Sequence, residues 1–253
     1  MQGDHVIVTC EHGGNRVPAA FAPAFAGREA LLASHRGWDP GALELGMQLA
    51  DAVAVRFFQS TVTRLLVDLN RSIGHPRLHV AEIAALPVAT RQQIVSQYYQ
   101  PHRDAVLTAV GRIVAGGGRV IHIASHSFTP VLDGVIRQAD VAWLYDPGRA
   151  GEQAFAARWR DSLKARRPDL RLRRNFPYQG KDDGLTRQLR RTYPAHRYIG
   201  IELEINQRFV LAGGAPWAAL RAAVVDAFVA ASVATSAAVL ADPYAATFPT
   251  MPP

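Results

Sequence analysis

The chain has 253 residues, of which 49% are hydrophobic and 19% charged, so it can bury a sizeable core and is not globally disordered. Its net charge of +7 comes from arginines spread along the sequence, without a basic segment interleaved with aromatic residues. This distribution argues against nucleic-acid binding, and an anionic small-molecule substrate or simply an arginine-rich proteome explains the charge as well. The single cysteine, Cys10, excludes an internal disulfide framework and a zinc site built from cysteines.

The sequence predicts neither a membrane span nor a signal peptide. No apolar run approaches the roughly 18 to 20 residues that a membrane-spanning helix requires. The N-terminal MQGDHVIVTC lacks the basic region and long apolar segment of a signal peptide. We therefore expect a cytoplasmic enzyme, and the sequence leaves its oligomeric state open.

Strand-like and helix-like segments alternate along the chain. The predicted strands cover residues 5–10, 60–70, 119–125, 141–146, 171–176 and 198–205. The predicted helices cover residues 39–57, 90–115, 149–166 and 215–241, with a little helix in a Pro/Ala-rich loop at 18–33. Asp39 and Pro40 have the types of an N-cap and a first helical residue, and the glycines at 116–118 are a strong helix stop.

This alternation is typical of a mostly parallel sheet that is covered by helices on both faces. The sequence shows no internal repeat, low-complexity block or obvious linker. We therefore predict one α/β domain over residues 1–241, followed by a loose tail at 242–253.

Polar side chains gather where the predicted strands end. In open α/β sheets, ligands bind at the carboxyl ends of the strands. Two of these ends carry histidines, His12 and His126, and the last strand carries Glu202 and Glu204, with Asn206 just beyond, on one face. The other candidates at strand ends are Glu11, Asp68, Asn70, Arg71, Ser125 and Ser127. Carboxylates within a strand that is dry on both faces need partners or a function.

Two histidines and several acids at one sheet edge suit a hydrolytic zinc site. Three protein ligands hold the ion, a water takes the fourth position, and a nearby carboxylate removes its proton. The alternative is that each histidine at a strand end is a hydrogen-bonded structural residue. His122, inside its strand, is expected in the core or behind the ligands, and Cys10 in the core. The remaining histidines are expected on the surface or in loops: His5, His35, His75, His79 and His196.

Two other kinds of active site find little support. A serine nucleophile at Ser125 is disfavoured because the chain has no G-x-S-x-G motif and because neighbouring side chains on an extended strand point apart. Nucleotide binding is disfavoured because neither G-x-x-x-x-G-K-[ST] nor G-x-G-x-x-G occurs.

Six sequence blocks occur in an order that resembles the N-formylglutamate amidohydrolase family, in particular its shorter predicted-amidohydrolase branch. They are CEHGGNRVP, GWDPGA, DLNRS, SHSFTPVLDG, NFPYQGKDDGLTRQLR and IELEINQ, and the resemblance runs from about residue 5 to residue 210. Members of this family are similar in fold to the zinc carboxypeptidases and aspartoacylases. The resemblance therefore implies a three-layer α/β/α domain. It also implies a metal-dependent hydrolase that cleaves the amide of an acidic amino acid, typically N-formyl-L-glutamate, to formate and glutamate.

The resemblance also implies roles for particular residues. His12 and His126 match ligands of one zinc ion, and other divalent transition metals are possible in its place. Asn15 stands where the related zinc carboxypeptidases and aspartoacylases have a glutamate ligand. Asp39 in GWDPGA matches an acid that the amidohydrolases themselves carry, so the resemblance implies Asp39 as the third ligand, with Glu11 as the alternative.

Glu204 matches the general base of the family, and Arg71 is the expected donor to the oxyanion. The substrate carboxylates favour bidentate arginine over lysine. The residues expected to contact the substrate are Asn70, Asn175, Tyr178, Thr186 and Arg187. A solvated helical face is the alternative for Arg187, Arg190 and Arg191. His102 matches a helical histidine of the family, and we expect it to pack or to lie on the helix surface rather than to touch substrate.

Two other functions stay open on the sequence. One is hydrolysis of a different N-acyl amino acid or a small peptide. The other is a non-catalytic protein that keeps the fold and binds an anionic metabolite.

Overall fold

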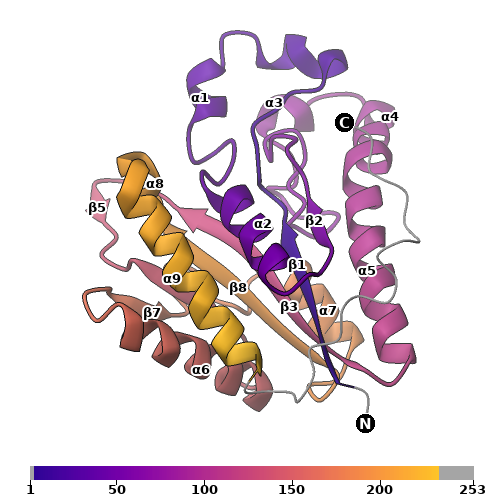
Figure 1. The fold of residues 1–253 in the computed structure, drawn as a ribbon. Helices are drawn as coiled ribbons and strands as arrows, with labels where there is room; N and C mark the ends of the chain where they lie inside the picture. The colour runs from indigo at the N-terminus through magenta and orange to yellow at the C-terminus, as the bar shows by residue number, and fades with distance from the viewer. Residues whose placement is uncertain (1–2, 234–253) are drawn as a thin grey trace.

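The computed structural model describes residues 3–233, and its centre is a six-stranded sheet in the order β2-β1-β3-β8-β6-β7 (Figure 1). The strands of this sheet are β1 (Asp4–Cys10), β2 (Phe57–Gln59), β3 (Arg119–Phe128), β6 (Val141–Leu144), β7 (Leu172–Arg174) and β8 (Tyr198–Asn206). Every neighbouring pair is parallel except β6 and β8, which are antiparallel. A separate antiparallel hairpin consists of β4 (Val131–Leu132) and β5 (Val135–Ile136). The predicted α/β class with a mostly parallel sheet is confirmed.

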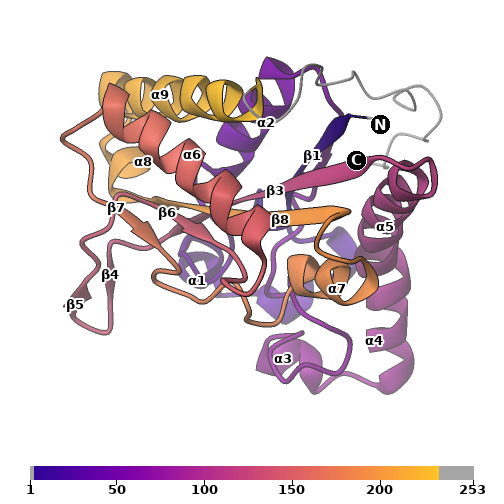
Figure 2. The same ribbon diagram turned by 90° about the horizontal axis from the view of Figure 1, so that it is seen from below.

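Helices cover both faces of this sheet. Seen from below, α6 (Ala150–Arg166) and α9 (Gly214–Val233) lie on one side of it, and α5 (Gln100–Ala115) and α7 (Leu185–Thr192) lie on the other (Figure 2). The other helices are η1 (Ala19–Phe25), α1 (Glu29–Ala33), α2 (Ala42–Ala52), α3 (Ala81–Ala84), α4 (Val88–Ile94), η2 (Val95–Tyr99) and α8 (Arg208–Ala212). One turn of π-helix, η2, joins α4 to α5, so the predicted helix 90–115 is present and ends at the expected glycines.

Alternation along the central strands assigns each side chain to one of the two layers. Ile121 and Ile123 of β3 belong to the core cluster formed with α2, α6 and α9, as do Ile201 and Leu203 of β8. Val120 of β3 packs instead with residues of α5 and α7. Because the side-chain period of a strand is two, the even-numbered residues at the carboxyl ends of β3 and β8 face the α5 and α7 layer. The side chains of His126 on β3 and of Glu202 and Glu204 on β8 are therefore expected on the same face of the sheet.

The predicted strand at 60–70 is wrong. The second strand of the sheet is the short β2, and the following segment makes only one isolated bridge, between Arg16 and Val62. Its apolar residues Leu65, Leu66, Val67 and Leu69 are buried instead in a second cluster against η1, α3 and α4. Its backbone bonds to the neighbouring loop, as in the hydrogen bonds from Asp68 N to Leu78 O and from Val80 N to Leu65 O. A continuous apolar run is therefore explained here by burial in a loop layer rather than by a sheet.

The expected helix N-cap at Asp39 is also wrong. Helix α2 begins at Ala42, and Gly41 precedes it with φ of 81°, a left-handed conformation that glycine adopts without strain. A Cβ at Gly41 would lie 2.9 Å from the Trp217 ring, so the position is sterically closed as well. No side chain caps this helix, and the carboxylate of Asp39 is free to turn towards the sheet.

Helix α9 contradicts the expectation that no segment is long and apolar enough to span a membrane. It is long and apolar enough to cross a membrane by length and composition, contrary to the sequence-based prediction. In the structure it packs against α6 and α2, and Trp217, Leu220 and Phe228 belong to the main core. The buried side of this apolar helix therefore belongs to the core. The remainder of the predicted helix, residues 234–241, and the predicted tail at 242–253 lie outside the described residues.

Burial confirms the core positions predicted for Cys10 and His122, and it corrects the surface or loop position predicted for His5. Cys10 is fully buried, and His122 is fully buried with its ring between Thr9 Oγ1 (2.9 Å) and the Tyr198 hydroxyl (2.7 Å). His5 was expected at the surface, but it is only 8% exposed because it belongs to β1, a strand whose seven residues are all buried.

Candidate metal centre

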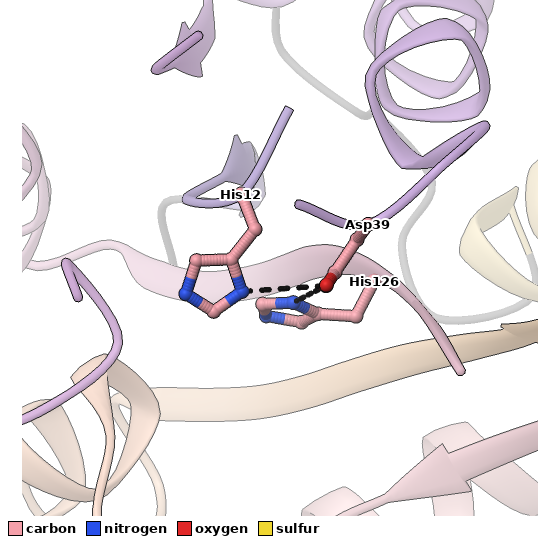
Figure 3. A group of neighbouring side chains, drawn as sticks. All are labelled: His12, Asp39 and His126. Atoms are coloured by element: carbon pink, nitrogen blue, oxygen red, sulfur yellow. Dashed lines mark hydrogen bonds and ion pairs between the residues drawn. The ribbon is translucent and has the colours of Figure 1, made fainter. Parts of the chain in front are cut away.

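Two imidazoles and one carboxylate converge on a single point at the carboxyl end of the sheet (Figure 3). Oδ2 of Asp39 lies 3.3 Å from Nδ1 of His12 and 2.9 Å from Nδ1 of His126. One donor atom from each residue lies within 4.8 Å of the others, and all three side chains are buried. This donor set, two imidazole nitrogens and one carboxylate oxygen, is suited to a divalent transition metal.

The sheet and one short segment place these three side chains. His12 follows β1 directly, His126 is on the neighbouring strand β3, and the amide of Asp39 donates to the carbonyl of His12 at 2.9 Å. Ser125 and Ser127 flank His126 and donate to the carbonyls of Ala42 and Pro40, at 2.8 and 2.7 Å. The two serines therefore bind the segment that carries Asp39, and Ser125 points away from its neighbour His126 as expected for an extended strand.

The second nitrogen of each imidazole also faces a carboxylate. Nε2 of His12 is 2.7 Å from Oδ1 of Asp68, and Nε2 of His126 is 3.2 Å from Oε2 of Glu11. The other oxygen of Glu11 lies 3.6 Å from Nε2 of His102, which is buried on α5. Carboxylates behind metal-binding histidines fix the ring orientation and the tautomer. The geometry thus places Asp39, rather than Glu11, beside the two Nδ1 atoms, and His102 has a buried role away from the cavity.

A partly buried guanidinium balances part of this negative charge. Arg64 donates from Nη1 to Oδ1 of Asp39 at 3.2 Å, and from Nη2 and Nε to Oδ2 of Asp68 at 2.7 and 3.2 Å. Burial alone would raise the pKa of both carboxyls. The neighbouring Arg64 and His12 outweigh burial at Asp68 and hold its pKa well below the usual range. His12, His126 and Arg64 do the same at Asp39.

Glu204 has a different environment on the adjacent strand. It is the register partner of His126 in the parallel pair of β3 and β8, and it is 4% exposed. Burial raises its pKa to about 8; His126 opposes this, and the Asp39 and Glu202 carboxylates add to it. Its Oε2 atom has no hydrogen-bond partner within residues 3–233. A buried carboxyl with a free oxygen and a pKa near neutrality has the properties of a general base.

The cluster opens into a cavity of about 430 Å³. Of the residues singled out in the sequence, it is lined by His12, Asp39, Asn70, Arg71, His126, Ser127, Tyr178, Glu202 and Glu204. Arg71 is held by hydrogen bonds from Nη1 to the carbonyls of Asp183 and Asn70, at 2.7 and 3.1 Å, whereas its buried Nε has no partner in the described part of the chain. Arg71 is thus anchored to two carbonyls at the cavity wall, where a guanidinium can meet an anion.

Three residues that we expected to contact substrate lie outside this cavity lining. Asn175 accepts hydrogen bonds from the amides of Tyr145 and Gly180 at 3.0 and 3.1 Å, so its side chain shapes the loop that carries Tyr178. Thr186 donates to Glu202 and thereby holds a residue of the cavity wall. Arg187 lies in a separate basic hollow of about 270 Å³, with Arg190 and Arg191 among its neighbours.

Sequence reasoning missed other residues of the site. Arg64 received no role, and Asp68 stood among the strand-end candidates without one, although they are four residues apart and of opposite charge. His35 and His75 line the cavity, whereas the sequence predicted only surface or loop positions for them. No repeated pattern marks these two histidines in the sequence, because loops bring them to the cavity.

The charges of the cluster fit a divalent cation. Glu11, Asp39 and Asp68 all have lowered pKa values and are ionised at neutral pH, whereas Arg64 is the one guanidinium in contact with them among the described residues. The Asp39 and Glu11 carboxylates raise the pKa of His126 well above its usual range despite burial, so a proton on this ring offsets part of the charge in the metal-free protein. Metal-binding imidazoles are neutral, and with both rings neutral the three carboxylates and one guanidinium leave an excess of two negative charges, which a divalent cation would offset. The residues present therefore fit a metal ion with a charge of two.

The protein is thus an α/β protein with a candidate metal site at the carboxyl ends of its parallel strands. Comparison with known sequences then gives the family: the model for N-formylglutamate amidohydrolase matches residues 4–211. The chain belongs to the N-formylglutamate amidohydrolase family and is an amidohydrolase-type hydrolase, as the sequence blocks predicted. No curated protein matches it.

Solved structures share the fold. The gene product Atu2144 from Agrobacterium tumefaciens is similar with a TM-score of 0.74 and 26% identity, over 90% of each chain. The N-formylglutamate amidohydrolase from Ralstonia eutropha JMP134 is similar with a TM-score of 0.69 and 19% identity, over 93% of this chain and 95% of the other. The second likeness supports the fold alone.

Proposed function

We propose that this protein is a metal-dependent amidohydrolase that cleaves the N-acyl amide of an acidic amino acid, with N-formyl-L-glutamate as its substrate. One observation carries the proposal: Oδ2 of Asp39 faces Nδ1 of both His12 and His126, and Glu204, whose Oε2 has no partner among the described residues, is in register with His126 on the next strand. Family membership supplies the reaction class.

In this proposal, His12, Asp39 and His126 hold one zinc ion or another divalent transition metal. Such an ion supplies Lewis acidity towards the amide carbonyl and lowers the pKa of a water molecule. Asp68 and Glu11 keep the two rings oriented from behind, as their contacts with Nε2 allow. The chain's own contribution is thus a buried set of donors, two from the ends of adjacent strands and one from a segment bound beside them.

Glu204 moves the proton. It takes a proton from the water whose oxygen attacks the formyl carbon, and it delivers that proton to the leaving nitrogen as the carbon–nitrogen bond breaks. The products are formate and glutamate, and the carboxylate is regenerated. Its raised pKa suits both halves of this transfer, because a group near neutrality can accept and release a proton with little free-energy cost.

Arg71 binds a substrate carboxylate in this proposal, rather than acting only on the oxyanion. Its Nη1 is held by two carbonyls and the residue lines the cavity, so a carboxylate there meets a guanidinium that is already positioned. Asn70 and Tyr178 line the same cavity and complete the proposed contacts. We leave Arg187 out, because it lies in the separate hollow.

The single cysteine is buried and unpaired, which agrees with a reducing compartment, so we propose the cytoplasm as the location.

Metal analysis together with formate release from N-formyl-L-glutamate tests the proposal, on the wild type and on His126→Ala. We expect about one metal ion per chain in the wild type, and loss of both metal and formate release in the variant. Bound metal without formate release would overturn the substrate and lead to a panel of other N-acyl amino acids and small peptides. Absence of metal from metal-replete wild type would overturn the mechanism and favour a binding protein for an anionic metabolite.

A further inference from the structure

Arg64 connects two carboxylates that act on the metal site from different sides. It bridges Oδ1 of Asp39, at 3.2 Å, and Oδ2 of Asp68, at 2.7 Å. The other oxygen of each carboxylate faces a different nitrogen of the same imidazole, since Asp39 Oδ2 is 3.3 Å from Nδ1 of His12 and Asp68 Oδ1 is 2.7 Å from Nε2. Arg64, Asp39, His12 and Asp68 therefore form a closed ring of contacts.

The ring is anchored in the main chain. The amide of Arg64 donates to the carbonyl of Gly37 at 3.1 Å, and the adjacent Thr63 hydroxyl donates to the same carbonyl at 2.9 Å. This brings the arginine beside the segment that carries Asp39. The amide of Asn70 donates to Oδ1 of Asp68 at 2.9 Å, which holds the second carboxylate. Both carboxylates are thus fixed by the backbone as well as by the guanidinium.

We propose that Arg64 is the positioning residue of the metal centre: it occupies Oδ1 of Asp39 so that this carboxylate offers one oxygen, and it holds Asp68 so that His12 offers Nδ1. This rests on the proposed function, which supplies the metal, and extends it to the way the ligands are presented. A guanidinium is suited to the task because its rigid fork reaches two carboxylates at once. A lysine ammonium in its place can keep the charge, but it has no second edge with which to span both groups.

A purely electrostatic role of Arg64 and a positioning role predict opposite effects of its removal on metal affinity. If the guanidinium only supplied positive charge, its removal would strengthen binding of a cation by removing repulsion. If it positions the two carboxylates, its removal weakens binding, because loss of groups behind metal ligands typically costs roughly 10- to 100-fold in metal affinity. The lysine variant separates the two roles, since it keeps the charge and loses the bridge.

The test measures zinc affinity, by competition with a chelator, for the wild type, Arg64→Lys and Arg64→Gln. We expect both variants to bind zinc about 10- to 100-fold more weakly than the wild type. With cobalt(II) as the probe, both variants should show weaker visible absorption, because a released Asp39 can offer its second oxygen and raise the coordination number. Wild-type affinity and cobalt spectrum in Arg64→Lys, or tighter binding in Arg64→Gln, would overturn the proposal.

Two controls keep the result interpretable. Arg28→Gln removes an arginine that is paired with Glu82 at the surface, and it should leave zinc affinity unchanged.

Asp68→Asn removes the second carboxylate of the ring and so interrupts the same ring at a different residue. If the ring acts as a unit, the double variant Arg64→Lys, Asp68→Asn should lose little more zinc affinity than either single variant. If the two residues act independently, the fold-losses in zinc affinity should multiply. Fold-losses that multiply in the double variant would contradict the ring.

Formate release from the same samples separates this inference from the proposed function. Wild type that binds zinc but releases no formate overturns the substrate, while the affinities still decide the role of Arg64. Wild type that releases formate, with Arg64→Lys binding zinc normally, overturns the positioning role alone.

Discussion

His126 and Glu204 are register partners on the adjacent parallel strands β3 and β8, and both line the same cavity. One side chain is a candidate metal ligand and the other is a buried carboxyl with a pKa of about 8. Because the two strands fix this pair, the ligand and the proposed base are placed by the sheet rather than by a loop. A site on rigid elements keeps the reacting groups in place without further ordering.

Glu204→Gln should abolish proton transfer without emptying the metal site. We expect the rate of formate release to fall roughly 100- to 10,000-fold, the usual contribution of a general base, because the amide cannot accept the proton. Metal content should stay at the wild-type level, since Glu204 is not one of the three clustered donors. Steady-state kinetics and metal analysis on the same preparation check both parts. Loss of metal from this variant would show that Glu204 is itself a ligand.

The raised pKa of Glu204 predicts a pH dependence of stability in the metal-free protein. Its pKa of about 8 in the folded chain exceeds the ordinary value of 4.5, so the folded state keeps a proton that the unfolded state has lost. The free energy of unfolding should therefore fall as pH rises from about 4.5 to 8, by up to about 1.4 kcal/mol per pH unit. Denaturant unfolding of metal-free wild type and Glu204→Gln measures this. The variant should gain stability relative to wild type as pH rises, and parallel pH profiles would contradict the prediction.

His122 predicts the opposite sign at lower pH. Burial lowers its pKa from 6.5 to about 4; Glu11 opposes this shift, and nearby cationic groups add to it. The unfolded chain therefore takes up a proton that folded His122 does not, and stability should be lost as pH falls from about 6.5 towards 4. Denaturant unfolding of His122→Gln should show a shallower loss in this window. An equally steep loss in the variant would assign the acid sensitivity to other groups.

Arg71→Lys should weaken substrate binding more than it slows the chemical step. The replacement keeps a positive charge but loses the two-pronged contact, and one hydrogen bond to a charged group is worth about 1.5–3 kcal/mol. We expect KM for N-formyl-L-glutamate to rise roughly 10- to 100-fold, with a smaller change in kcat. Arg28→Lys, at the exposed pair with Glu82, is the control and should leave both constants unchanged. A fall in kcat at constant KM would instead indicate a role at the oxyanion.

Removal of the metal should stop the reaction and leave the fold intact. The central strands pair through their backbone ladders, and apolar side chains join the sheet to its helices, so we expect the fold to persist without the ion. Chelation should lower Tm, because a ligand present at about 1,000 times its Kd stabilises by about 4 kcal/mol. Far-UV circular dichroism should be unchanged, and adding zinc should restore formate release. Unfolding on chelation would show that the metal is structural.

Much of the fold followed from local patterns. Alternation of strands and helices predicted the α/β class, and the glycines at 116–118 predicted the end of a long helix. The strand at 60–70 failed because apolar content alone does not distinguish a sheet strand from a buried loop. The expected N-cap at Asp39 failed because its carboxylate contacts His12, His126 and Arg64 instead of the helix amides.

The sequence by itself determined which residues end the strands, since period and residue type mark His12, His126 and Glu204 without reference to any contact. Only the tertiary structure decided which residues stand behind them. Arg64 meets Asp39 across 25 residues, and His126 meets Asp39 across 87. Such pairings depend on how loops pack against the sheet and on the burial of several charges together. Local propensity carries no information about either, so the ring around His12 emerged only when the chain was folded.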